Sequence, residues 1–286
     1  MHLFYRKNGE GRPLIILHGL FGMSDNWMTL AKQFAENGFA CYTVDLRNHG
    51  RSPHSDEFNF SVMAEDLSEL MDDLTLSSAS FLGHSLGGKT AMLFATMHPE
   101  KVEKLVVADI APKYYPPHLD SETSALNSVD LNVINSRKEA EEQLRISLHD
   151  EATVQFLLKN LYWKEEIMRG KPGTIKNETG QGRNGEPVKD GSSETTKKLA
   201  WRFNLEALEK NVDAVGEALP ENARFYKPTL FLRGEKSGYI SEQDIPDIKK
   251  HFPQAVVKTI TVAGHWIHAE NPKGFMEAVL EFLNAY

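Results

Sequence analysis

Residues 79–88 read Ala79-Ser80-Phe81-Leu82-Gly83-His84-Ser85-Leu86-Gly87-Gly88, and they carry the strongest indication of the fold. It begins as an apolar run of strand length, and residues 87–98 that follow favour a helix. Gly-x-Ser-x-Gly between a strand and a helix is typical of a tight, strained turn that lifts the serine hydroxyl above the edge of a sheet. The first N–H groups of the helix favour negative charge on an oxygen reacting there. Ser85 is therefore the predicted nucleophile.

A second apolar run, residues 14–17, ends in His18-Gly19-Leu20-Phe21-Gly22. In such folds the loop after this strand supplies one backbone N–H group to an oxyanion hole, and the residue after the nucleophile supplies the other. The candidate donors are Leu86 and either Leu20 or Phe21. His18 resembles a base at first sight, but a histidine that packs the loop by bonding to backbone is the favoured interpretation.

The predicted base lies between the last strand and the last helix, in the stretch Gly264-His265-Trp266-Ile267-His268. A histidine on this loop can reach over the sheet edge and accept the serine proton. His265, directly after the glycine, is the better candidate. His268 fits a supporting or capping role.

The acid of the triad has two candidates. The loop after the strand at 229–233 carries Ser237 where an aspartate is expected, and Glu235 is the carboxylate nearby. Asp109 stands at the end of the apolar strand at 104–110, next to the strand of the nucleophile. A carboxylate buried there is costly unless it is paired, which favours a functional reading. We predict Asp109, with Glu235 as the alternative.

Strand-like runs alternate with amphipathic stretches at both ends of the chain, which predicts a mostly parallel sheet with helices on both faces. The predicted strands are 13–18, 40–45, 79–84, 104–110, 229–233 and 256–262, and the predicted helices are 27–38, 60–74, 87–98, 241–252 and 271–284.

The middle of the chain breaks this alternation, so we expect residues 1–112 and 226–286 to form the core and residues 113–225 an inserted helical cap. Ser136 and Glu139 form a capping box at the start of one of its helices. Residues 169–198 are rich in polar residues and poor in large apolar ones, which predicts a surface loop or an exposed hairpin without a catalytic part.

Composition narrows the setting. The chain has 286 residues, 41% of them hydrophobic, and a net charge of −8 without a long Lys/Arg run, which argues against a nucleic-acid partner. Cys41 is the single cysteine, which fits a reducing compartment. The N-terminal residues lack the apolar region of a signal peptide, and the apolar runs are too short for a membrane span. We expect a cytoplasmic protein, without a metal or other cofactor.

Three aromatic residues flank the motifs and are candidates for the lining of the pocket, although each can equally be packing: His84, Trp27 and Trp266.

The motifs together resemble the α/β-hydrolase superfamily, and more closely the YbfF-type bacterial esterases and their mitochondrial abhydrolase relatives. The stretches that carry the resemblance are HGLFG at 18–22, DLRNHGRS at 45–52, GHSLGGK at 83–89, DIAP at 109–112, WRFN at 201–204 and GHWIHAE at 264–270. The order serine, acid, histidine agrees with this family.

The resemblance implies a sheet of the eight-stranded type, a helical cap over the site, and Asp109 as the triad acid. It also implies esterase or thioesterase activity on small-molecule substrates with short acyl groups. In this interpretation Ser85 attacks the acyl carbon, His265 transfers the proton, Asp109 orients His265, and water cleaves the acyl-enzyme. Two alternatives use the same residues: an acyltransferase in which an alcohol replaces water, and a ligand receptor without turnover.

Overall fold

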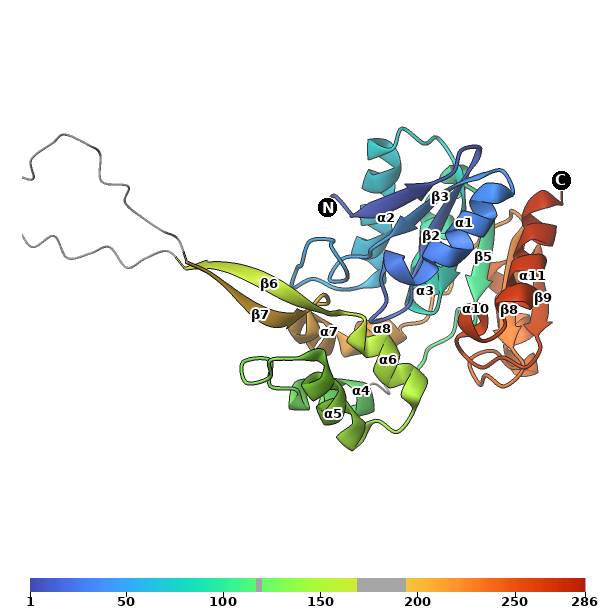
Figure 1. Ribbon diagram of the computed structural model, residues 1–286. Coiled ribbons are helices and arrows are strands. Elements are labelled where there is room, and N and C mark those ends of the chain that lie inside the picture. Colours follow the sequence, from blue (N-terminus) through green and yellow to red (C-terminus); the bar gives the residue numbers. More distant parts are fainter. Residues whose placement is uncertain (117–119, 169–193, 286) are drawn as a thin grey trace, which may run out of the picture. The chain divides into compact units, whose positions relative to one another are not determined.

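The computed structural model describes residues 1–116, 120–168 and 194–285 (Figure 1). The chain divides into two compact units. The first comprises Met1–Ser124 and Arg202–Tyr286, and the second is Ala125–Trp201.

The first unit contains a seven-stranded sheet in the order β1-β3-β2-β4-β5-β8-β9. The edge strand β1 is antiparallel to β3, and the other neighbouring strands are parallel. The strands are β1 (Tyr5–Asn8), β2 (Arg12–Leu17), β3 (Phe39–Val44), β4 (Ala79–His84), β5 (Val102–Ala108), β8 (Thr229–Gly234) and β9 (Ala255–Ile260). The expected mostly parallel sheet is confirmed; among the described residues it has seven strands, where the resemblance implies a sheet of the eight-stranded type.

Helices connect these strands. The α-helices of this unit are α1 (Met28–Glu36), α2 (Phe60–Asp73), α3 (Leu86–Met97), α7 (Leu205–Lys210), α8 (Val212–Gly216), α9 (Ile245–His251), α10 (Ile267–Glu270) and α11 (Pro272–Asn284), and the short 3-10 turns are η1 (Ser24–Trp27), η2 (Pro99–Lys101) and η3 (Glu242–Asp244). A further helix, α4 (Asp120–Ser128), crosses the boundary between the two units. The predicted strands and helices of the core agree with these bounds to within a few residues.

The core fills both faces of the sheet because successive side chains of a strand point to opposite sides. On one face, Leu82 and Val106 pack in a cluster with residues of α1 and α11, which lie side by side in Figure 1. On the other face, Phe81 of β4 packs against Phe94 of α3 in a tilted arrangement, with ring centroids 5.0 Å apart. Helices on both faces cover the central strands, so β4 is buried along its length and β5 is buried from Leu105 to Ala108.

The second unit is smaller than the expected 113–225 insertion. Residues 113–124 and 202–225 belong to the first unit, where Asn204 N–H donates to the carbonyl of Asn48 at 2.9 Å and the Phe203 ring lies 5.0 Å from that of Phe21. These contacts tie residues 203 and 204 to the loop after β2 and the loop after β3.

The second unit is also not purely helical. It contains α5 (Arg137–Ser147), α6 (Glu151–Leu158) and an antiparallel pair formed by β6 (Leu161–Met168) and β7 (Glu194–Trp201). Of the polar segment 169–198, residues 169–193 lie outside the described residues, and residues 194–198 belong to β7.

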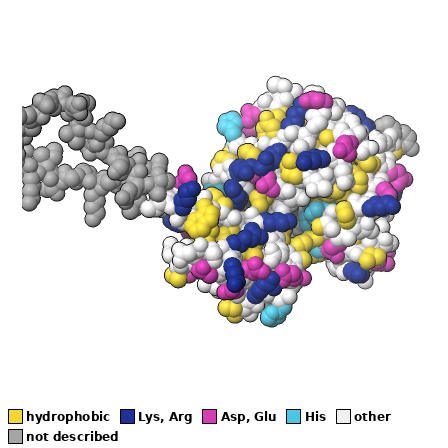
Figure 2. Space-filling view, viewed as in Figure 1, with side chains coloured by type: hydrophobic (Ala, Val, Ile, Leu, Met, Phe, Trp, Pro, Cys, Tyr) yellow, Lys and Arg dark blue, Asp and Glu magenta, His cyan; other side chains and the backbone are white. Residues whose placement is uncertain are grey.

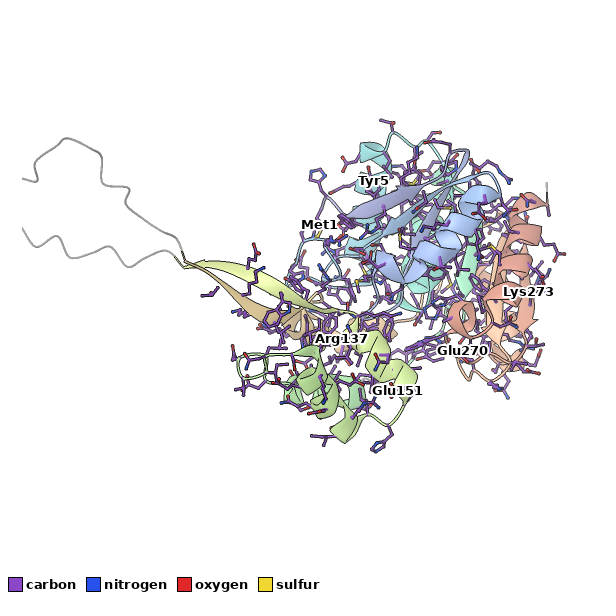
Figure 3. All side chains as sticks on the ribbon, in the orientation of Figure 1. Met1, Tyr5, Arg137, Glu151, Glu270 and Lys273 are labelled. Atoms are coloured by element: carbon purple, nitrogen blue, oxygen red, sulfur yellow. The ribbon has the colours of Figure 1, made fainter. Side chains whose placement is uncertain are left out.

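Charged side chains define the ends of the helices in this unit. Ser136 is the N-cap of α5, since its Oγ accepts the Glu139 N–H at 3.2 Å. The predicted capping box is only half formed, because the Glu139 carboxylate accepts the N–H of Asn135 at 3.0 Å instead of that of Ser136. Arg145 of α5 pairs with Glu151 at the start of α6 at 2.8 Å. Arg137 donates to the carbonyl of Leu158 at 3.0 Å, and Figure 3 labels Arg137 and Glu151. These contacts fix α5 against α6.

On the face that Figure 2 shows, side chains of both charges lie among neutral ones. Across the described ranges, no helix combines the length and the apolar composition that crossing a bilayer requires.

Candidate active site

Ser85 stands at the turn between β4 and α3 with backbone angles of φ 50° and ψ −115°. These angles are strained for a residue with a side chain. The turn is so tight that a Cβ atom on Gly83 would lie 2.3 Å from the carbonyl oxygen of Gly87. The sequence pattern thus produces the expected turn, with Ser85 in a strained conformation between the end of β4 and the start of α3.

Three residues of the predicted site have strained backbone angles. Phe21, Ser85 and Asp109 all have positive φ, at 57°, 50° and 52°. Each follows the carboxyl end of a neighbouring strand, β2, β4 or β5. Backbone strain of this kind costs on the order of 1–3 kcal/mol per residue and persists where the surrounding structure enforces it. The sheet edge above these three strands is therefore the candidate active site.

Asp109 is fully buried and accepts three hydrogen bonds. The Gly234 N–H donates to its Oδ1 at 2.9 Å, and the Ser237 hydroxyl donates to its Oδ2. His265 Nδ1 lies 2.8 Å from the same Oδ2. Because an ionised carboxylate only accepts, Nδ1 carries the proton and Nε2 of His265 is left with its lone pair. The structure thus brings together two of the predicted residues in the geometry of an acid that orients a base.

The alternative acid lies elsewhere. Glu235 is exposed, and its Oε2 accepts the N–H of Val262 at 2.7 Å at the end of β9. Among the described residues, no hydrogen bond joins Glu235 to His265. Its carboxylate therefore supports the loop after β9, and the geometry favours Asp109 as the partner of His265.

The turn that carries His265 is held from several sides. The carboxylate of Glu270, at the end of α10 (Figure 3), accepts the N–H groups of Gly264 at 2.9 Å and Trp266 at 3.1 Å. The His84 Nε2 donates to the carbonyl of His265 at 2.9 Å, and the two imidazole centroids lie 4.8 Å apart. Because His84 directly precedes Ser85, this bond connects the turn of Ser85 to the turn of His265.

On the oxyanion side, the structure distinguishes the two candidates in the loop after β2. The Phe21 N–H donates to Nε2 of His49 at 3.2 Å, so it is already used. No acceptor contacts the Leu20 N–H within the described ranges. Leu86 is the first residue of α3, and the N–H groups of a first helical turn have no acceptor inside the helix. Leu20 and Leu86 are thus the two donors that the geometry leaves open.

The histidines beside the site are buried and neutral. Burial lowers the pKa of His18 to about 4 and the pKa of His49 to about 3. Burial, together with the neighbouring His268 and His265, holds the pKa of His84 well below its usual value. His18 Nδ1 bonds to the carbonyl of Gly19 at 2.8 Å, and its Nε2 accepts the Leu46 N–H at 3.0 Å. Its interpretation as a loop-packing residue is confirmed.

The proposed pocket residues have different environments. Trp27 is 1% exposed and stacks on His268, with ring centroids 4.3 Å apart, so it packs in the core and presents no face to an entrance. His84 is also buried, between the turn of Ser85 and that of His265. Trp266 is half-buried on the turn of His265 and is the one of the three with an accessible side chain.

Sequence reasoning missed the loop contacts that support the base. Ser237 was noticed only as the absence of an aspartate, and its hydroxyl in fact contacts Asp109. Tyr239 stacks on His265, with centroids 3.8 Å apart. Its spacing of two residues from Ser237 was visible in the sequence, but the contact depends on how the loop after β8 folds over the sheet edge.

Comparisons with known proteins agree with this site. Residues 12–272 match the sequence profile of the family described as alpha/beta hydrolase fold. The chain is 35% identical over 283 residues to the sn-1-specific diacylglycerol lipase ABHD11 of Danio rerio, covering 96% of this chain and 79% of that protein. It is 34% identical to Esterase YbfF of Escherichia coli, covering 95% and 93% of the two chains.

Among solved structures, a marine microorganism esterase matches with a TM-score of 0.83 and 41% identity, covering 98% of this chain and 99% of that one. The resemblance stated from the motifs is therefore confirmed over nearly the whole length. The matched residues, 12–272, contain both the turn of Ser85 and the turn of His265. This chain therefore belongs to the α/β-hydrolase-fold family.

Proposed function

We propose that this protein is a serine hydrolase that cleaves carboxylic esters through an acyl-enzyme on Ser85. The observation that carries the proposal is the bond between His265 Nδ1 and the buried Asp109, at 2.8 Å, beside the turn of Ser85. A base oriented in this way at the end of a strained serine turn is suited to acyl transfer. The names esterase and diacylglycerol lipase of the relatives support the same reaction class.

In the proposed mechanism, His265 takes the Ser85 hydroxyl proton at Nε2 while Ser85 Oγ attacks the acyl carbon. The N–H groups of Leu20 and Leu86 hold the oxyanion that forms. His265 then gives the proton to the leaving alkoxide, and the acyl-enzyme remains. Water, deprotonated by His265, attacks this ester, and Ser85 recovers its proton when the acid leaves. Asp109 keeps the proton of His265 on Nδ1 and stabilises the imidazolium.

The proposed substrates are small esters and thioesters with short acyl groups, a class that the resemblance to YbfF-type esterases implies. The half-buried Trp266 beside His265 is a candidate for contact with such a group. A panel of p-nitrophenyl esters of increasing acyl length, an acyl-CoA and a diacylglycerol would rank these classes. A maximum at long acyl chains would contradict the short-acyl part of the proposal.

The test of the nucleophile is Ser85→Ala on p-nitrophenyl butyrate. We expect kcat to fall roughly 10⁴-fold or more, because the attacking oxygen is lost. Ser121→Ala, at an exposed serine of α4, is the matched control and should keep wild-type turnover. Turnover of Ser85→Ala near that of wild type would contradict the proposal.

Acyl transfer and ligand reception are separate outcomes of the same assay. With added ethanol, formation of the ethyl ester at the expense of the free acid would identify an acyltransferase, because an alcohol then competes with water for the acyl-enzyme. A single burst without further turnover would favour the receptor alternative. Steady release of the free acid supports the hydrolase.

A further inference from the structure

Tyr239 lies flat against the imidazole of His265. The two ring centroids are 3.8 Å apart, and the ring planes are 15° from parallel. Tyr239 belongs to the loop after β8, where its N–H donates to Ser237 Oγ at 3.2 Å. The hydroxyl of Ser237 in turn donates to Asp109. One short loop therefore contacts the candidate acid through Ser237 and the face of the candidate base through Tyr239.

Tyr115 holds Tyr239 in this position. Its ring stacks on that of Tyr239, with centroids 5.5 Å apart and planes 30° from parallel. Its hydroxyl donates to the Tyr239 carbonyl at 2.7 Å and accepts the Ala111 N–H at 2.9 Å. Burial raises the pKa of Tyr115 above its ordinary value, so the hydroxyl remains a donor. Tyr239 is thus fixed through both its ring and its backbone.

The side chains of two lysines contact the Tyr115 ring. The Nζ atom of Lys89 is 5.1 Å from the centre of this ring, and that of Lys113 is 5.2 Å from it. The Lys89 ammonium also donates to the carbonyl of Lys113 at 2.6 Å. These contacts pin Tyr115, and they leave the Tyr239 ring as the group that meets His265.

The other charged or titratable groups that face His265 come from three places. Asp109 after β5 bonds to its Nδ1. His84 at the end of β4 is held neutral by burial, so it adds no positive charge beside the base. From the same turn and α10 come Glu270, which accepts two backbone N–H groups of the turn, and His268, whose ring meets that of His84.

The Tyr239 ring itself stays neutral. Burial, followed by the charges of Asp109 and Glu122, raises the pKa of its hydroxyl. The face of a neutral phenol ring carries partial negative charge and attracts a cation within about 6 Å of its centroid. When His265 takes a proton, the positive imidazolium therefore forms directly on this face, in a half-buried site where such attraction is poorly screened.

We propose that Tyr239 is a positioning residue for catalysis, whose ring face stabilises the imidazolium of His265 and fixes the plane of the imidazole. The proposal rests on the proposed function, in which His265 is the base. Asp109, held by Ser237, bonds to the edge of the imidazole, and Tyr239 packs against its face. The hydrogen bond and the ring contact therefore restrict different rotations of the same side chain.

The direct test is an NMR titration of His265 in the full chain carrying ¹³Cε1-labelled histidine, with His265→Asn to assign the signal. In Tyr239→Leu, an apolar side chain without a ring face, we expect the pKa of His265 to be lower than in wild type by about 0.5 to 1.5. Tyr239→Phe keeps the ring face and should restore most of the difference. This readout needs no turnover, so it decides the role of Tyr239 even if the proposed ester hydrolysis is wrong.

The kinetic test uses the pH dependence of kcat/KM for p-nitrophenyl butyrate. In Tyr239→Leu we expect kcat/KM to fall about 3- to 30-fold. The acid limb of its pH profile should move to lower pH, because the imidazolium of His265 is less stable without the ring face. Tyr226→Leu is the matched control, since Tyr226 is 65% exposed. This variant should retain both the wild-type kcat/KM and the wild-type position of the acid limb.

A role in packing alone would lower the rate of Tyr239→Leu without moving the limb or the NMR pKa, and this outcome overturns the proposal. An equal loss in Tyr239→Phe also overturns it, because the ring face is still present in that variant. Should Tyr239→Leu fail to fold, Tyr239→Met takes its place with the same expected and overturning results.

Discussion

The side chains of Asp109 and His265 meet at 2.8 Å although 156 residues separate them along the chain. The contact forms because Asp109 directly follows β5 and His265 follows β9, and β8 lies between these two strands in the sheet. The loop after β8 fills the interval with Ser237, which donates to the same carboxylate oxygen as His265. A carboxylate that follows β5 can therefore contact a histidine that follows β9. In this protein the loop between them, after β8, contributes the hydroxyl of Ser237 as a donor instead of a second carboxylate.

The first prediction separates the two acids that the sequence left open. Asp109→Asn should lower kcat by about 10³- to 10⁴-fold, because an amide no longer fixes the proton on Nδ1 of His265. Glu235→Gln should change kcat less than about threefold, since Glu235 bonds to the Val262 N–H. Both are measured with p-nitrophenyl butyrate at saturating concentration. A larger loss in Glu235→Gln would reverse the assignment.

The second prediction concerns the hydroxyl of Ser237. Ser237→Ala removes one of three donors to the buried Asp109, and a hydrogen bond to a charged group contributes about 1.5–3 kcal/mol. We expect kcat to fall about 10-fold with little change in KM. Ser241→Ala, which removes the capping hydroxyl of η3 in the same segment, should cost stability but leave kcat unchanged. Equal kcat in Ser237→Ala and wild type would show that the bond has no part in turnover.

The third prediction tests how closely the oxyanion loop approaches the nucleophile. A Cβ atom at Gly19 would lie 2.9 Å from His84 Nδ1 and 3.4 Å from the Ser85 Cβ. Gly19→Ala should therefore displace Ser85 or Leu20 and lower kcat about 10- to 100-fold, because small misplacements of reacting groups are costly. Gly238→Ala, whose Cβ would face open space, is the control for an alanine near the site. Full activity of Gly19→Ala with a normal unfolding temperature would contradict this geometry.

The fourth prediction follows from the buried neutral histidines. Between pH 6.5 and the lowered pKa values of about 4 for His18 and about 3 for His49, the unfolded chain binds protons that the folded chain does not. The free energy of unfolding must therefore decrease as the pH falls through this window, and the contribution is fully present above pH 6.5. Removing one such histidine should make the pH dependence shallower.

Denaturation with urea at pH 7.0 and pH 4.5 measures this effect. His49→Gln should lose about 2–3 kcal/mol less stability than wild type over this interval, because its side chain cannot take up a proton on unfolding. The exposed His149→Gln should show the dependence of wild type. If His49→Gln and wild type have the same slope, His49 is not the buried neutral group that the structure describes.

Much of the fold was predictable because its signals are local. The apolar runs at 79–84 and 229–233 have strand length. Ser136 caps α5 through a bond to Glu139, which is only three residues further along the chain. Ser85 and His265 were predictable for the same reason, since each lies in a short turn whose glycine and flanking strand are adjacent in sequence.

Other features depended on contacts between distant segments. The bounds of the second unit follow from Phe203 packing on Phe21 and from Asn204 bonding to Asn48. The choice of Leu20 over Phe21 as oxyanion donor depends on His49, which accepts the Phe21 N–H from a loop 28 residues away. No local pattern encodes such pairs, because they exist only once the sheet has brought the loops together.

The succession of a strand, a serine turn and a helix follows from the sequence alone, since local propensity and glycine spacing act within a few residues. Only the tertiary structure decided which carboxylate accompanies His265 and which ring covers its face. The strand order places β5, β8 and β9 side by side, and burial then makes an unpaired Asp109 too costly, so its partners Ser237 and His265 are fixed by the packing of the whole sheet edge.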